Sequence, residues 1–145
     1  MEISELKKQI REIFDPLAAR LGLKGPVEFS LSSSDFHFGY STEAIGVELT
    51  VDMSDFFIYA LIYKPTGNCI PIGYNDQTGR RQKLYLQEAL KDLSIQTNKE
   101  TEALQKLAGD YLNCLKMTGI LARLLEQNWP QLSSNSQRWF KTNTP

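Results

Sequence analysis

The sequence predicts an α+β fold, with an N-terminal helix, a mostly antiparallel sheet of four or five strands, and two C-terminal helices packed on one face of that sheet. Two observations carry this prediction. Apolar residues recur every three or four positions near both ends of the chain and every second position in the middle, which are the periods of helices and of half-buried strands. The strands also follow one another without intervening helices, which is typical of an antiparallel sheet.

Length and composition are those of one globular domain. The chain has 145 residues, of which 41% are hydrophobic and 23% are charged, close to globular averages. We expect residues 1–130 to form a single domain and residues 131–145 to form a polar tail. The formal net charge of -1 argues against a nucleic-acid partner, which a strongly basic surface would attract.

Two features bear on the compartment. No apolar run approaches the roughly 18 residues that a membrane-spanning helix needs, so no membrane partner is expected. The N-terminal residues lack a basic stretch followed by an apolar one, and Cys69 and Cys114 form no CxxC pattern. These features predict a cytoplasmic protein with reduced thiols.

The N-terminal segment has the apolar stripe of an amphipathic helix. Pro16 lacks the N–H group that an inner helical position needs, which predicts a kink or a break at that point. Gly22 or Gly25 is expected to end the element. The apolar residues of the stripe lie three or four positions apart: Ile3, Leu6, Ile10, Ile13, Leu17 and Leu21.

The segments 27–31, 36–40 and 45–53 alternate apolar with polar residues and predict three half-buried strands. We expect the apolar side chains, including Val27 and Phe29, to face the helices. The opposite face would then present the polar set of Glu28, His37, Glu48, Thr50 and Asp52.

Two further strands and two helices follow. The segment 56–63 is apolar on both faces, which is typical of a central or covered strand. A short fifth strand is expected at 69–74. It would lie at the edge of the sheet, because Pro71 has no N–H group to donate to a neighbouring strand. Leucine spacing predicts a helix over 84–93, and a longer last helix is expected from Lys99 to the Trp129–Pro130 pair.

The sequence contains no recognisable catalytic, metal or phosphate-binding motif. His37 is the single histidine, and we expect it at the surface of a hairpin. One histidine and two isolated cysteines cannot supply a zinc site, and no EF-hand loop, phosphate loop or GxSxG motif occurs. We therefore expect no enzymatic activity, no metal and no cofactor.

The polar sides of the strands predict an acidic, aromatic surface for a protein partner. Tyrosine and phenylalanine are enriched in interfaces, and an acidic patch attracts a basic partner. The alternative is that a C-terminal helix covers this face. The candidate partner-binding residues on it are Glu48, Asp52, Phe57, Tyr59 and Tyr63.

Two other places carry weaker hypotheses. Trp139 and Phe140 are large apolar residues in a polar tail, and they are expected to dock either on the domain itself or on a partner. Arg80, Arg81 and Lys83 precede the predicted helix 84–93, where free N–H groups can bind an anion. The alternative for these cations is a solvated helix end.

These observations favour a small cytoplasmic protein-binding module, of an immunity type or a chaperone type, that docks a basic protein through its acidic aromatic sheet face. The alternatives are an anion- or nucleotide-handling protein that uses Arg80, Arg81 and Lys83, and a structural subunit of a homodimer.

Overall fold

The computed structural model describes residues 2–67 and 69–140 and confirms the α+β fold. Five strands form one sheet in the order β1-β2-β3-β4-β5, and each neighbouring pair is antiparallel. The strands are β1 (Lys24–Phe29), β2 (Asp35–Ser41), β3 (Gly46–Asp52), β4 (Phe57–Tyr63) and β5 (Lys83–Tyr85). The helices are α1 (Ile3–Arg20), α2 (Leu86–Asp92), α3 (Asn98–Leu107), α4 (Cys114–Ser134) and α5 (Ser136–Trp139), with a 3₁₀ turn, η1 (Tyr111–Asn113), before α4.

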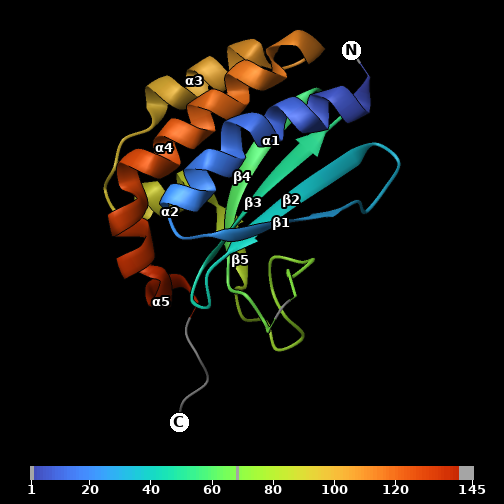
Figure 1. Ribbon diagram of the computed structural model, residues 1–145. Coiled ribbons are helices and arrows are strands. Elements are labelled where there is room, and N and C mark those ends of the chain that lie inside the picture. Colours follow the sequence, from blue (N-terminus) through green and yellow to red (C-terminus); the bar gives the residue numbers. More distant parts are fainter. Residues whose placement is uncertain (1, 68, 141–145) are drawn as a thin grey trace.

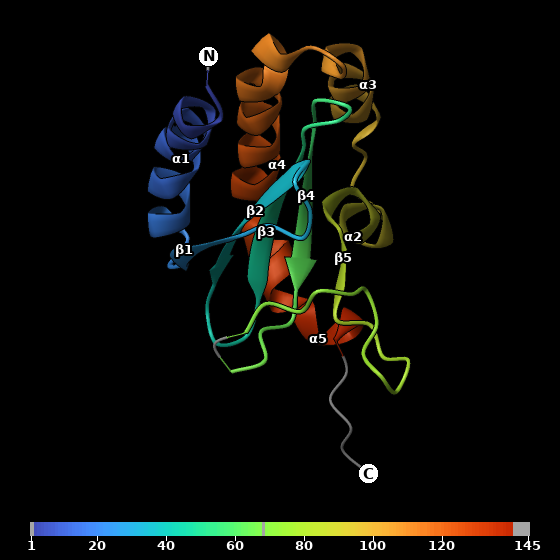
Figure 2. The same ribbon diagram turned by 90° about the vertical axis from the view of Figure 1, so that its right-hand side faces the viewer.

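The sheet has one face toward the helices and one face away from them (Figures 1 and 2). The first, called here the helix face, packs against α1 and α4 and holds the core. Its burial supplies the main driving force for folding. The side chains that β2 to β5 direct to this face are all buried: Phe36, Phe38, Tyr40, Val47, Leu49, Val51, Ile58, Ala60, Ile62 and Leu84. The second, called here the open face, carries the alternate residues of each strand.

Helix α1 runs from Ile3 to Arg20, so of the kink or break predicted at Pro16 the break does not occur. Proline removes the donor to the carbonyl of Glu12. Glu12 is exposed, and water can therefore replace that donor. The buried residues before and after the proline, including Phe14 and Leu17, belong to one continuous stripe against the core.

Strand β1 presents its faces in the opposite sense to the prediction. Val27 lies opposite Gly39 and Phe29 lies opposite His37, which places both on the open face. Glu28 lies on the helix face, where the Lys7 ammonium contacts its carboxylate at 3.1 Å. The cause is the register irregularity between Lys24 and Val27, because a slip of one residue exchanges the two faces of a strand.

The fifth strand lies at Lys83–Tyr85 rather than at the predicted 69–74. It pairs with β4 and places Leu84 opposite Ile62 on the helix face. The segment between β4 and β5 instead crosses the lower end of the open face, in front of the sheet in Figure 2. Ile70 of this segment lies against Gly39, where the lack of a side chain leaves room for it.

The C-terminal part forms more helices than predicted. The expected single helix from Lys99 is two helices, α3 and α4, separated by Gly109 with a positive φ of 87° and by Asp110, whose carboxylate accepts from the Leu112 N–H at 2.9 Å. Helix α4 continues through Pro130 to Ser134, so the predicted stop at Trp129–Pro130 is wrong.

The end of the chain packs on the domain as far as residue 140, which is one of the two outcomes expected for Trp139 and Phe140. Trp139 is 7% exposed and Phe140 is 4% exposed, and both belong to the core. The Trp139 Nε1–H donates to Asp92 at 2.8 Å, and Arg138 forms an ion pair with the same carboxylate. Of the tail predicted over 131–145, residues 141–145 lie outside the described part of the chain.

Candidate functional site

A buried polar network lies at the centre of the open face. His37 of β2 is 5% exposed, Glu48 of β3 is 2% exposed, and Lys83 of β5 is 5% exposed. The predictions of a surface histidine and of a solvent-facing Glu48 are therefore wrong. These side chains are buried because the β4–β5 segment and the β1–β2 turn close over this part of the sheet (Figure 2). The Phe29 ring also stacks on the His37 ring, with the two ring centroids 4.6 Å apart.

Direct contacts join the groups of this network across three strands. The Lys83 ammonium donates to Glu48 Oε1 at 3.0 Å. The Thr50 hydroxyl donates to Glu48 Oε2 at 2.6 Å. His37 Nδ1 lies 2.9 Å from Thr50 Oγ1, and His37 Nε2 lies 2.9 Å from Asp35 Oδ2. Every buried side-chain nitrogen and oxygen in the described part of the chain has a hydrogen-bond partner.

The hydrogen-bond pattern identifies the charge of His37. Thr50 donates its only hydroxyl proton to Glu48, so its oxygen must accept from His37 Nδ1–H. The Asp35 carboxylate is an acceptor, so His37 Nε2 must donate as well. These contacts favour protons on both ring nitrogens, which makes His37 an imidazolium cation balanced by Asp35, while Lys83 is balanced by Glu48.

The pKa shifts follow from the same contacts. Burial alone would lower the pKa of His37, but its hydrogen bonds to Glu48 and Asp35 outweigh burial and raise it. Burial alone would raise the pKa of Glu48, but His37, Thr50 and Lys83 together lower it. The pKa of Asp35 is lowered too, since bonds from His37 and from the Ser32 and Leu31 N–H groups outweigh its partial burial.

We expect the contribution of this network to stability to be largest between about pH 4.5 and about pH 6.5, the ordinary pKa values of glutamate and histidine. Folding raises the pKa of His37. Its contribution to stability is therefore complete below pH 6.5 and is lost as the pH rises through the pKa that His37 has in the folded protein. Folding lowers the pKa of Glu48. Its contribution to stability is therefore present above pH 4.5 and is lost as the pH falls through the pKa that Glu48 has in the folded protein. Urea unfolding over the acidic and neutral range measures both limbs.

The variant His37→Gln serves as the control for this pH dependence. It should lose the decline of stability on the alkaline side and keep the decline on the acid side. An alkaline decline of the same steepness in both proteins would show that His37 is not held as a cation.

A cleft of about 320 Å3 opens above the network. Its floor is β2 to β5, and its walls are the β1–β2 turn and the β4–β5 segment. We call it the tyrosine cleft, because Tyr59, Tyr74 and Tyr85 form one side of it. It is lined by Leu31, Asp35, His37, Glu48, Thr50, Asp52, Tyr59, Leu61, Ile72, Tyr74, Lys83 and Tyr85.

The aromatic rings along the cleft form a continuous row. Ring centroids are 4.7 Å apart for Phe57 and Tyr59, 5.8 Å for Tyr59 and Tyr85, and 5.6 Å for Tyr85 and Tyr74. The hydroxyls of Tyr74 and Tyr85 bond to each other at 2.6 Å, which holds the wall against the floor. This row offers both ring faces and hydroxyl groups to a ligand.

Exposed apolar side chains surround the same cleft. Ile72 is 68% exposed, and Val27, Leu31 and Tyr74 are each about half exposed. All four belong to the open face or to the segments that border it. Scattered exposed apolar residues are ordinary, but a group around one concave site is typical of a contact surface.

The structure brings together part of the predicted partner surface. Tyr59 lines the cleft, Asp52 lies at its rim, and Phe57 adjoins Tyr59. Glu48 is enclosed in the ion network. Tyr63 is also enclosed: its ring packs over Gly46 and its hydroxyl donates to the Tyr40 carbonyl at 3.2 Å. Among the residues described, up to position 140, no C-terminal helix covers the open face (Figure 2).

The two remaining groups of predicted site residues lie elsewhere. Trp139 and Phe140 are buried among the helices, so their side chains are not presented to a partner. The prediction that Arg80, Arg81 and Lys83 sit at a helix start is wrong, because α2 begins only at Leu86. Arg80 and Arg81 belong to the β4–β5 segment, and Lys83 is the β5 residue paired with Glu48.

Sequence reasoning missed Ile72, Tyr74 and Tyr85. The signal for Tyr85 was present, since Lys83, Leu84 and Tyr85 alternate as a short strand does and so place Lys83 and Tyr85 on one face. No signal of this kind pointed to Ile72 and Tyr74. Their position depends on how the long β4–β5 segment folds back over the sheet.

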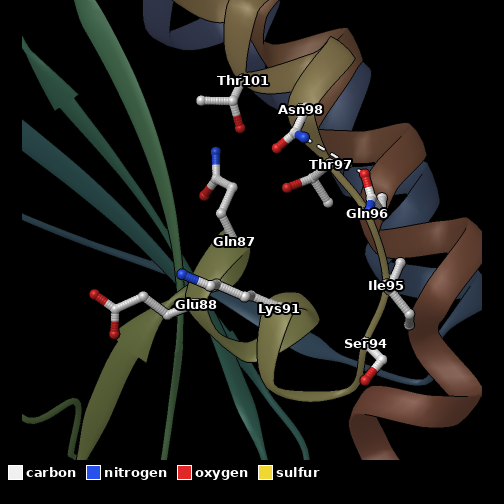
Figure 3. A pocket seen from close by; sticks show the side chains of 9 residues that line it. All are labelled: Gln87, Glu88, Lys91, Ser94, Ile95, Gln96, Thr97, Asn98 and Thr101. Atoms are coloured by element: carbon white, nitrogen blue, oxygen red, sulfur yellow. Dashed lines mark hydrogen bonds between the residues drawn. The ribbon is translucent and has the colours of Figure 1, made fainter.

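A second hollow, of about 540 Å3, lies between α2 and α3 (Figure 3). Gln87 of α2 points toward Thr101 of α3, while Glu88 points away from them. Its only charged lining residues are Glu88 and Lys91, and its only apolar one is Ile95. No set of groups converges there on one position, so the tyrosine cleft is the better candidate site.

No known protein family, curated protein or solved structure matches the chain. Across residues 2–67 and 69–140, no helix is both long enough and apolar enough to cross a membrane. The same residues include no group of three or more His, Cys, Asp or Glu side chains placed to hold a metal ion. The arrangement of the open face is therefore what bears on function.

Proposed function

We propose that this chain is a non-catalytic binding module that docks a protein partner on the open face of its sheet, with the tyrosine cleft at the centre of the contact. The observation that carries the proposal is the convergence of exposed apolar residues from separate segments around a row of tyrosines. Tyrosines in a concave, partly apolar site are the usual anchors of protein interfaces.

The chemistry of the cleft supports binding rather than catalysis. A general base needs an unprotonated nitrogen or oxygen within reach of a substrate. Both His37 nitrogens are engaged by Asp35 and Thr50, and Lys83 and Glu48 neutralise each other. The network thus stabilises the floor of the cleft, and the groups left for a ligand are the tyrosines, Asp52 and the apolar rim.

The wider role that fits such a module is occlusion of a partner, as an immunity-type or chaperone-type protein does. A surface with carboxylates beside tyrosines suits a basic partner, because complementary charge guides association and orientation. Cys69 and Cys114 are both free thiols, which supports a reducing compartment such as the cytoplasm.

Affinity capture with variants of the open face tests this function. Ile72→Asp and Tyr59→Ala should each lose a protein that the unmodified chain captures, since a charge or a void at the contact centre weakens interfaces strongly. Leu112→Asp is the matched control, because Leu112 is 71% exposed and lies in η1, outside the cleft. The control should retain capture.

Equal capture by all three variants would contradict docking on the open face. A dimer of this chain in light scattering that Ile72→Asp dissociates would identify a second copy, rather than another protein, as the occupant.

A further inference from the structure

We infer that the tyrosine cleft recognises a lysine or arginine side chain of the partner, whose cation enters between the tyrosine rings and Asp52. This inference rests on the proposed docking function and adds the chemistry of the residue that the cleft selects. Three independent features of the open face support it: its residual charge, its aromatic row and its apolar rim.

The cleft carries negative charge that the protein itself does not neutralise. Asp35, Glu48 and Asp52 line it, and the cations His37 and Lys83 are bound to the first two. Within the described part of the chain, Asp52 takes part in no ion pair, and its carboxylate accepts from the Ser54 N–H at 2.9 Å. One carboxylate at the rim therefore remains available to a cation from outside.

The aromatic row provides the second part of a cation site. The negative faces of aromatic rings attract ammonium and guanidinium groups, most strongly where water is excluded. Tyr59 and Tyr85 lie beside each other in the row, on neighbouring strands. Burial and the charge of Asp52 raise the pKa of the Tyr59 hydroxyl, which agrees with a position close to that carboxylate.

The apolar rim argues for a side chain carried by a protein rather than a free cation. Val27, Leu31 and Ile72 extend the surface beyond the cleft, where only a longer ligand can cover them. A phosphate-bearing partner would be repelled by the unpaired carboxylate of Asp52. A basic residue flanked by apolar neighbours in the partner fits both the cleft and its rim.

The test uses four pentapeptides with an acetylated N-terminus and an amidated C-terminus. The central residue is lysine, arginine, norleucine or glutamate, and a leucine stands on each side of it. Binding is followed by the amide chemical shifts of the labelled protein. We expect the lysine and arginine peptides to shift resonances of the cleft and to bind about tenfold more tightly than the norleucine peptide. The glutamate peptide should not bind.

The variant Asp52→Asn locates the charge effect, and it should abolish most of the preference for lysine over norleucine. Asparagine keeps an oxygen that can accept from the Ser54 N–H, so the turn after β3 is preserved. Glu43→Gln is the control, because Glu43 is an exposed carboxylate in the turn between β2 and β3, outside the cleft lining. This variant should keep the full preference.

Equal binding of the lysine and norleucine peptides would overturn the inference, and so would the absence of any cleft shift at millimolar peptide. Saturation of the cleft by spermidine with no peptide binding would overturn it too, in favour of a free cation. None of these results depends on the affinity capture described above, so the docking function and the preference for a cation can fail separately.

Discussion

Replacement of Glu48 by alanine is expected to lower the free energy of unfolding by about 3–5 kcal/mol, because it leaves buried charges without a partner. Glu48 is 2% exposed and is bonded by Lys83 and Thr50, with the His37 ring 3.4 Å away. Without the carboxylate, the Lys83 ammonium is enclosed with no counter-charge. Urea denaturation followed by circular dichroism measures the loss.

The double variant Glu48→Ala with Lys83→Met separates two effects on stability: the unpaired charge left on Lys83 and the loss of the Glu48 side chain itself. It should be more stable than Glu48→Ala alone, because methionine removes the uncompensated ammonium and keeps most of the buried volume. Glu43→Ala is the surface control and should change the free energy of unfolding by no more than about 0.5 kcal/mol. A Glu48→Ala protein as stable as this control would show that the ion network is not buried.

Replacement of Trp139 by alanine is expected to cost about 3–5 kcal/mol, the usual range for a large aromatic residue removed from a core. Trp139 is 7% exposed, and its indole N–H donates to Asp92 at 2.8 Å. The substitution leaves a cavity in the core and removes the indole bond to Asp92, which then keeps its ion pair with Arg138. Thermal and urea unfolding both report this loss.

Gln137→Ala is the matched control in the same short helix, because Gln137 is exposed. It should leave the free energy of unfolding unchanged within about 0.5 kcal/mol. Trp139→Phe should lie between the two, since it keeps an aromatic ring but loses the hydrogen bond to Asp92. Unchanged stability of Trp139→Ala would mean that the segment after α4 does not pack on the domain.

The periodic parts of the fold were predictable, whereas the elements that depend on a single local event were not. The apolar stripe of α1 and the alternation in β2 and β3 report which side of each element is buried. The inverted faces of β1 follow from one register irregularity, which leaves no periodic trace. The continuation of α4 through Pro130 has no periodic signal either: Pro130 is exposed, and Leu132 beyond it is buried.

The candidate site was predictable only in part. Asp52 and Tyr59 were expected on one face from the period of two in their strands, and the cleft contains both. The burial of Glu48 was not predictable, because its partner Lys83 lies 35 residues away along the chain. A carboxylate with alternating neighbours has the same pattern whether it faces water or an ammonium group.

The sequence by itself determined the fold class, the antiparallel order of strands β2 to β4 and the side of β2 and of β3 that enters the core. Local periodicity is sufficient for this, because the burial of one face repeats along every element. The tertiary structure decided which polar residues of the open face became a closed ion network and which remained available to a ligand. That outcome depends on the β4–β5 segment, which carries Ile72 and Tyr74 over the sheet, and on β5, which places Lys83 beside a glutamate 35 residues away in the chain.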